Sequence, residues 1–101
     1  MTRYSKVIEA DAEKLLVEGI KSLGGLCFKL KFLGIMGAPD RLVLLPGRRF
    51  YFVELKKLGG KLEPSQVNLF PKIEKLGFKV ELLVGNDAVE TFINSLKDHH
   101  V

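Results

Sequence analysis

The stretch DRLVLLPGRRFYFVELK, residues 40–56, consists of two apolar runs separated by a turn sequence. Pro46-Gly47-Arg48 suits a tight turn, and the β-branched and aromatic residues on either side of it suit strands. The stretch therefore predicts an antiparallel hairpin, with one strand from Asp40 to Leu45 and the next from Arg49 to Lys56.

The second strand of this hairpin ends in two charged side chains. Successive side chains of a strand point to opposite faces, so one face holds Phe50, Phe52, Glu54 and Lys56 and the other holds Tyr51, Val53 and Leu55. Burying a carboxylate or an ammonium group costs several kcal/mol unless it has a partner. Glu54 and Lys56 are therefore predicted to belong to a functional site and not to the core.

Asp40 opens the neighbouring strand and could lie within reach of Glu54. Two carboxylates, together with the backbone carbonyl of Leu55, form the kind of oxygen set that Mg²⁺ binds. Phosphodiester hydrolysis requires such a cation, an activated water molecule and a positive group near the developing charge, a role that suits Lys56. The pattern predicts a metal-dependent phosphodiesterase site with Asp40, Glu54 and Lys56 as its catalytic residues.

The rest of the chain alternates helical and strand patterns. Apolar spacing predicts helices over residues 7–23, from Pro64 to Leu76, and from a capping box at Asp87 and Glu90 to Leu96, and strands over residues 26–32 and 78–84. Pro71 predicts a kink or a late start in the second helix. The order is α-β-β-β-α-β-α. Four aromatic residues at strand spacing are interpreted as core: Phe28, Phe32, Phe50 and Phe52.

Length and composition limit the organisation of the chain. With 101 residues, 47% of them hydrophobic, we expect a single domain over residues 1–101. No apolar run approaches the roughly 20 residues of a membrane span, and the charged N-terminal stretch lacks a secretory pattern, so we expect a cytoplasmic protein. Cys27 and the pair His99-His100 do not have zinc-site spacing, which leaves oxygen ligands for any metal.

The charge balance favours a polyanionic partner. Sixteen basic and twelve acidic residues give a formal charge of +4. Phosphate contacts dominate the affinity of proteins for DNA. We expect a phosphate-binding rim formed by six basic residues: Lys29, Lys31, Arg41, Arg48, Lys57 and Lys61.

The acids and the lysine occur in a recognisable pattern. Pro39-Asp40, thirteen intervening residues and then Glu54-Leu55-Lys56 resemble the PD-(D/E)xK signature of restriction-endonuclease-like nucleases. Three segments extend the likeness, namely GAPDRLVLLPG at residues 37–47, FVELK at residues 52–56 and PSQ at residues 64–66. Together they resemble the VRR-NUC family of structure-selective nucleases, and the resemblance covers nearly the whole chain, from the first helix to the strand at Phe78.

The resemblance implies an α/β restriction-endonuclease-like fold with a central mixed sheet flanked by helices, Mg²⁺ or Mn²⁺ as cofactor, and DNA as substrate. Small stand-alone members are similar to Holliday-junction resolvases, which act as homodimers on branched DNA. The resemblance also implies a metal-site glutamate on the first helix, for which Glu13 matches best and Glu9, one turn earlier, is the rival. Gln66 matches the catalytic glutamine of the family.

Three other readings remain open at this point. A non-catalytic DNA-binding module on the same fold would use the positive charge without the acids. A monomer would suit a flap or nicking nuclease better than a junction resolvase. Hydrolysis of a phosphate ester outside nucleic acids ranks below both.

Overall fold

Over residues 2–97, the part of the chain that the computed structural model describes, the elements follow the predicted order α-β-β-β-α-β-α. They are α1 (Thr2–Ser22), β1 (Leu26–Lys29), β2 (Arg41–Leu45), β3 (Arg49–Lys56), α2 (Pro64–Lys75), β4 (Lys79–Val84) and α3 (Gly85–Lys97). Side chains are described for residues 11–97. The side chain of Glu9 and the pair His99-His100 therefore lie outside the described part. In residues 2–97, no helix has the length and apolar character needed to cross a membrane.

The four strands form one mixed sheet in the order β1-β2-β3-β4. The pairs β1–β2 and β2–β3 are antiparallel, and β4 runs parallel to β3. The predicted hairpin is confirmed: Leu45 pairs with Arg49 at the turn, and Arg41 pairs with Val53 at the open end. Gly47 and Arg48 have positive φ values of 81° and 61°, as tight hairpin turns require. Asp40 precedes the first residue of β2 instead of beginning that strand.

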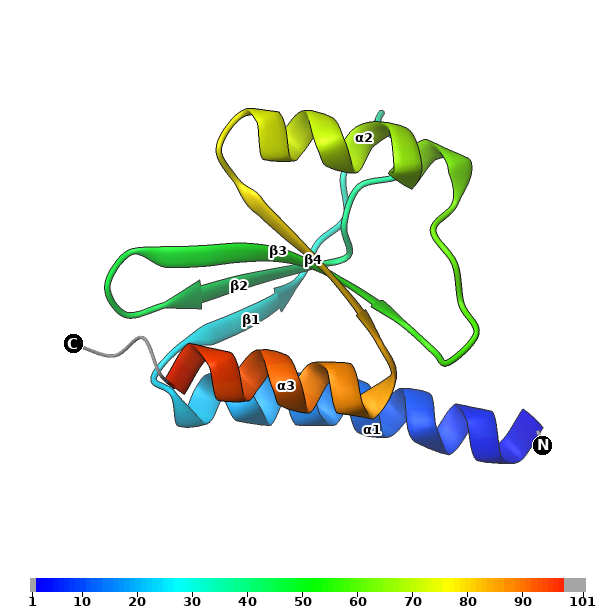
Figure 1. The fold of residues 1–101 in the computed structure, drawn as a ribbon, viewed down its shortest axis with the longest axis vertical. Coiled ribbons are helices and arrows are strands. Elements are labelled where there is room, and N and C mark those ends of the chain that lie inside the picture. Colours follow the sequence, from blue (N-terminus) through cyan, green and yellow to red (C-terminus); the bar gives the residue numbers. More distant parts are fainter. Residues whose placement is uncertain (1, 98–101) are drawn as a thin grey trace.

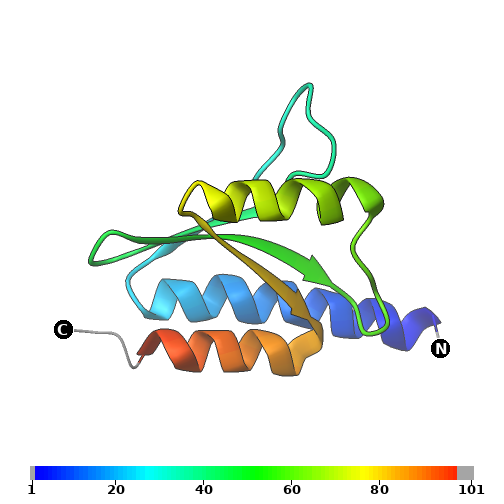
Figure 2. The same cartoon turned by 45° about the horizontal axis from the view of Figure 1, so that its top comes forward.

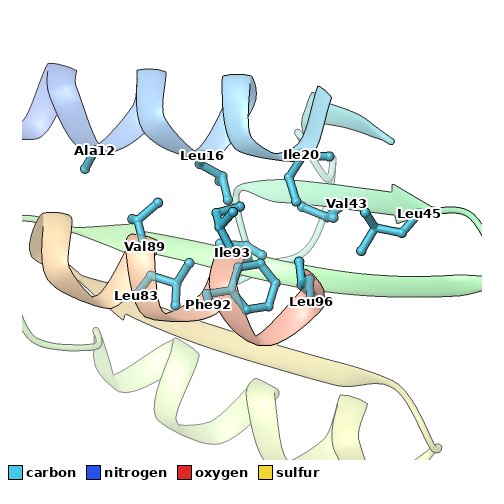
Figure 3. Packing of buried hydrophobic residues seen from close by; sticks show 11 residues of the cluster. Ala12, Leu16, Ile20, Val43, Leu45, Leu83, Val89, Phe92, Ile93 and Leu96 are labelled. Carbon is cyan, nitrogen blue, oxygen red and sulfur yellow. The ribbon is translucent and has the colours of Figure 1, made fainter. Parts of the chain in front are cut away.

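The helices cover the two faces of the sheet unequally. Figures 1 and 2 show α1 and α3 side by side on one face and α2 alone on the other. The main core lies beneath α1 and α3, where Leu16, Ile20, Val43, Val53 and Val89 are fully buried. Side chains from both helices meet the sheet there (Figure 3). Each such side chain contributes about 1.5–3 kcal/mol by leaving water. This core fixes which face of β3 carries Glu54 and Lys56.

The aromatic residues of the first strand do not belong to this core. Phe28 is 45% exposed and Phe32 is 42% exposed, so their prediction as core residues was wrong. In β1 it is Cys27 that packs against the core, because α1 and α3 cover that face whereas α2 covers only part of the other. Phe50 and Phe52 are half-buried, and their ring centroids lie 5.3 Å and 6.3 Å from that of Phe78.

Several element boundaries differ from the expectation: α1 begins at Thr2 instead of residue 7, and β1 ends at Lys29 instead of residue 32. α2 begins at Pro64 as predicted and continues through Pro71 to Lys75, so the predicted late start was wrong. Pro71 lies on the exposed side of α2, where its ring meets solvent and only one backbone donor is lost. α3 begins at Gly85, two residues before the predicted cap at Asp87.

Candidate active site

The two acids predicted to converge lie together at the open end of the β2–β3 hairpin. The backbone N–H of Asp40 donates a hydrogen bond to Oε1 of Glu54, with a distance of 3.1 Å from nitrogen to oxygen. The pairing of Arg41 with Val53 continues by one position to bring Asp40 opposite Glu54. Glu54 is only 6% exposed, so this contact holds a buried carboxylate in a fixed orientation.

Lys56 supplies the positive group on the same face of β3. Its Nζ lies 3.3 Å from Oε2 of Glu54, and the lysine side chain is 19% exposed. The two oxygens of Glu54 therefore face two different partners, the Asp40 N–H and the Lys56 ammonium. A buried carboxylate needs such partners, because an unpaired one would cost several kcal/mol. The grouping predicted for Asp40, Glu54 and Lys56 is present in the structure.

Asp40 carries the unsatisfied group of the site. Its Oδ1 is buried and has no hydrogen-bond partner among the described residues. Burial, and then the nearby charge of Glu54, raise the pKa of Asp40 above its ordinary value, against the opposing effects of Arg41 and the backbone of Leu55. Burial and a second carboxylate both disfavour the charged form of a carboxyl group, and a bound cation would stabilise that charged form.

The donor set fits a small hard cation. Mg²⁺ is commonly held by one or two carboxylates with several waters, and the residues here offer the carboxylates of Asp40 and Glu54 together with the carbonyl of Leu55. Among residues 11–97, no group of three or more acidic, histidine or cysteine side chains is placed to bind a metal. Within these residues, the donors for a cation would be the two carboxylates and the Leu55 carbonyl.

Glu13 contacts two basic side chains, and the role of metal ligand that the resemblance implies for it stays a prediction. Its carboxylate lies 3.2 Å from a terminal nitrogen of Arg41 and 3.6 Å from Nζ of Lys29. Arg41 is only 6% exposed, so Glu13 is the counter-ion of a buried guanidinium group. Arg41 links Glu13 to the site, because it directly follows Asp40 in the chain.

Gln66 has a structural role at the start of α2. Its side-chain Oε1 accepts a hydrogen bond of 2.9 Å from the N–H of Glu63, and the residue is 6% exposed. This is one half of a capping box, and it fixes the first turn of the helix. The catalytic role that the resemblance implies for Gln66 stays a prediction.

Gly37 was not singled out by sequence reasoning, yet it joins the loop before Asp40 to α2. A Cβ atom at Gly37 would lie 2.6 Å from the carbonyl carbon of Ser65 and 2.9 Å from the backbone nitrogen of Gln66. The loop therefore packs backbone against backbone on the first turn of α2. The glycine content of residues 34–37 was the available signal, but it does not reveal the neighbouring element.

The six basic residues expected to form a phosphate-binding rim do not all lie near the acids, and their contact with phosphate stays a prediction. Four of the six have exposed side chains and lie within or next to segments that lead to the site: Lys29, Lys31, Lys57 and Lys61. Arg41 is buried against Glu13. Arg48 lies in the turn at the far end of the hairpin, since the turn and the acids are at opposite ends of β2 and β3.

A surface groove lies away from these residues. It runs between α1 and α3 and is lined in part by Leu15, Gly19, Val89 and Ile93. This groove is on the opposite side of the sheet from Lys56 and Glu54. We place the site at the acids nevertheless, because Asp40 Oδ1 is a buried oxygen without a hydrogen-bond partner among the described residues and lies beside the buried carboxylate of Glu54. The other such oxygen, on Asn86, has no acid beside it in a comparable contact within the described residues.

A mixed sheet whose open hairpin end holds two acids and a lysine is the arrangement of the PD-(D/E)xK class of nucleases. Comparison with known proteins agrees. A solved structure described as a VRR_NUC domain superimposes with a TM-score of 0.74 and 34% sequence identity, covering 92% of this chain and 97% of that one. A protein of Acyrthosiphon pisum secondary endosymbiont phage 1, named "Putative nuclease p44", is 38% identical over 79 residues, which are 78% of this chain and 85% of that protein. No protein-family model matches the chain.

The chain belongs to the VRR-NUC family of nucleases, with the restriction-endonuclease-like fold that the sequence predicts.

Proposed function

We propose that the protein is a Mg²⁺- or Mn²⁺-dependent endodeoxyribonuclease that acts as a homodimer on branched DNA such as Holliday junctions. The observation that carries the proposal is the acid pair at the hairpin end, where Asp40 Oδ1 is buried without a partner beside Glu54. A carboxylate pair of this kind would repel phosphate in the absence of metal, so a protein that only binds DNA has no use for it.

Each residue of the site has a distinct task in this mechanism. Asp40, Glu54 and the carbonyl of Leu55 would hold the cation, which when bound withdraws charge from the scissile phosphate and lowers the pKa of a water molecule. Lys56 lies beside them as a donor to the attacking water or to the phosphate oxygens as their charge increases. Because its side chain is only 19% exposed, water screens its charge less than that of a surface lysine.

The exposed lysines bring the DNA backbone to these groups. Lys29, Lys31, Lys57 and Lys61 are exposed, and the chain has a formal charge of +4. Binding through phosphate contacts releases counterions, so the affinity for DNA should fall steeply as salt concentration rises. Two sites in a homodimer would allow both strands of a junction to be cut, as the resemblance to resolvases suggests.

A cleavage panel tests the proposal. Four-way junction, flap and linear duplex substrates are incubated with the protein and Mg²⁺, Mn²⁺ or EDTA. We expect junction cleavage that depends on metal, and a loss of 100-fold or more in rate for Asp40→Asn and for Lys56→Met, the usual scale for removing one stabilising charge. Lys21→Met is the matched control, because Lys21 is exposed in the last turn of α1 and lies outside the set of lysines proposed to bind DNA.

Each alternative has its own outcome in the same experiment. Full activity of Asp40→Asn or Lys56→Met would refute the mechanism. Salt-dependent binding of DNA without cleavage under any metal condition would indicate a binding module. Cleavage of flaps by a protein that sediments as a monomer at micromolar concentration would indicate a flap or nicking nuclease.

A further inference from the structure

The loop between β1 and β2 presents an apolar tip to solvent. Its large hydrophobic side chains are exposed to 42% at Phe32, 88% at Leu33, 53% at Ile35 and 83% at Met36. We call residues 32–36 the apolar tip. Scattered apolar residues are normal on a protein surface, but a contiguous exposed group marks a contact with another molecule.

The base of the loop is held firmly. The N–H of Leu30 donates a hydrogen bond of 2.8 Å to the carbonyl oxygen of Asp40, which closes the loop. Pro39 is fully buried, and Gly37 packs on the backbone of Ser65. In Figure 2 the loop stands out beyond α2. The apolar tip is therefore presented from a fixed base and is not part of a free segment.

The apolar tip lies close to the candidate site along the chain. Met36 is four residues before Asp40, and four residues of extended chain span at most about 14 Å. Stacked bases on one strand are about 3.4 Å apart. A DNA strand that runs from a phosphate at Asp40 toward the loop would therefore reach Met36 within roughly four nucleotides of that phosphate.

The charges around the apolar tip favour DNA over a second copy of this chain. Lys31 is exposed next to Phe32, and the Lys29 side chain is 73% exposed. A two-fold interface built on this loop would bring identical lysines of two copies together, whereas a phosphate backbone neutralises them. Leucine, isoleucine, methionine and phenylalanine are also the residue types that proteins insert between base steps.

We propose that the apolar tip docks on unstacked bases beside the scissile phosphate, and that it thereby favours DNA whose stacking is already interrupted. The inference rests on the proposed action of the protein on DNA. Separating stacked bases costs free energy, and this cost is smallest where bases are mismatched or already unpaired. The loop then contributes to structure selectivity without reading sequence, because its side chains offer no hydrogen bonds to base edges.

Fluorescence of 2-aminopurine tests this contact directly. The base is placed at the branch point of a four-way junction, or at the matching position of an intact duplex, and the protein is added in EDTA so that nothing is cleaved. We expect wild-type protein to raise the fluorescence at the branch point and not in the duplex. The double variant Leu33→Ser/Met36→Ser should lose this rise and bind the junction roughly 5- to 100-fold more weakly, with duplex affinity changed by less than about twofold.

Leu76→Ser is the matched control, because Leu76 is 76% exposed at the end of α2. It should keep both the fluorescence change and the affinity of wild type. Thermal unfolding of each variant confirms folding, which we expect to be unaffected by substitutions at such exposed positions.

The outcomes separate this inference from the proposed function. Unchanged fluorescence and affinity in Leu33→Ser/Met36→Ser would overturn the inference. Conversion of a dimer to a monomer by that variant would also overturn it, because the loop would then belong to a contact between two protein copies. Cleavage of junctions without unstacking would reject the inference and keep the nuclease activity. Unstacking by a wild-type protein that never cleaves would keep the inference and reject the activity.

Discussion

Replacing Gly37 by alanine should destabilise the protein through two effects of known origin. Gly37 has a φ of +85°, a left-handed conformation that costs alanine about 1 kcal/mol relative to glycine. The added Cβ would also lie 2.6 Å from the carbonyl carbon of Ser65, about 0.8 Å inside the 3.4 Å at which ordinary contact begins. The atoms that this Cβ would meet, the carbonyl carbon and oxygen of Ser65 and the nitrogen of Gln66, all belong to backbone, so the loop or α2 must move.

The size of the effect follows from these two contributions. Overpacking of this kind costs about 1–3 kcal/mol, so the total for Gly37→Ala is about 2–4 kcal/mol. Gly34→Ala provides the matched control: its φ is +79°, and nothing lies within 4 Å of the added Cβ. It should therefore cost only about 1 kcal/mol.

Urea unfolding at 25 °C measures both free energies of unfolding, with equal m-values as the check that the unfolded states are comparable. In thermal unfolding, a loss of 1 kcal/mol lowers the Tm of a domain of this size by about 4–8 °C. Since Gly37 is three residues from Asp40, Gly37→Ala should also weaken the stabilisation that we expect from added Mn²⁺, whereas Gly34→Ala should not. Equal destabilisation by the two variants, within about 0.5 kcal/mol, would refute the packing of the loop on α2.

Two further predictions concern charges at the site. Because burial and the charge of Glu54 raise the pKa of Asp40, wild-type protein loses stability as pH rises through that pKa, and Asp40→Asn does not. In EDTA at pH 7 the variant should therefore be more stable than wild type, and the difference should disappear below the ordinary pKa of 3.8, as thermal unfolding over a pH series would show. Equal stability of the two proteins at every pH would contradict the repulsion between Asp40 and Glu54. Glu13→Gln leaves the buried Arg41 guanidinium without its counter-ion and should cost about 1–3 kcal/mol, less than a fully buried pair because the Glu13 side chain is 45% exposed. In an Arg41→Met background the same substitution should cost less than about 0.5 kcal/mol, and an unchanged cost there would show that Glu13 acts through some other contact.

The hairpin and its acid pair could be predicted from the sequence because both are local. The turn type sets the register, and the two-residue period of a strand then decides that Glu54 and Lys56 share a face. Asp40 comes opposite Glu54 from the same register. No information from distant parts of the chain is needed for any of these steps.

The features that sequence reasoning missed depend on distant elements. The alternation in β1 is equally compatible with either face being buried, and only the unequal covering of the sheet by helices leaves Phe28 in solvent. Similarly, helical periodicity places Glu13 on a face of α1 but does not say that a buried Arg41 lies opposite. The packing of Gly37 on Ser65 is a tertiary contact of the same kind.

The closeness of Asp40 and Glu54 along the chain also bears on how the protein folds. The two residues are 14 positions apart and meet across a hairpin, whose formation is a microsecond event with a small loop-closure cost. The parallel pairing of β3 with β4 has to wait for α2 to cross between them, which makes it a slower, non-local step. A cation held by the two acids would therefore stabilise structure that exists before the fold is complete. We expect Mg²⁺ to increase the folding rate of this chain more than it decreases the unfolding rate.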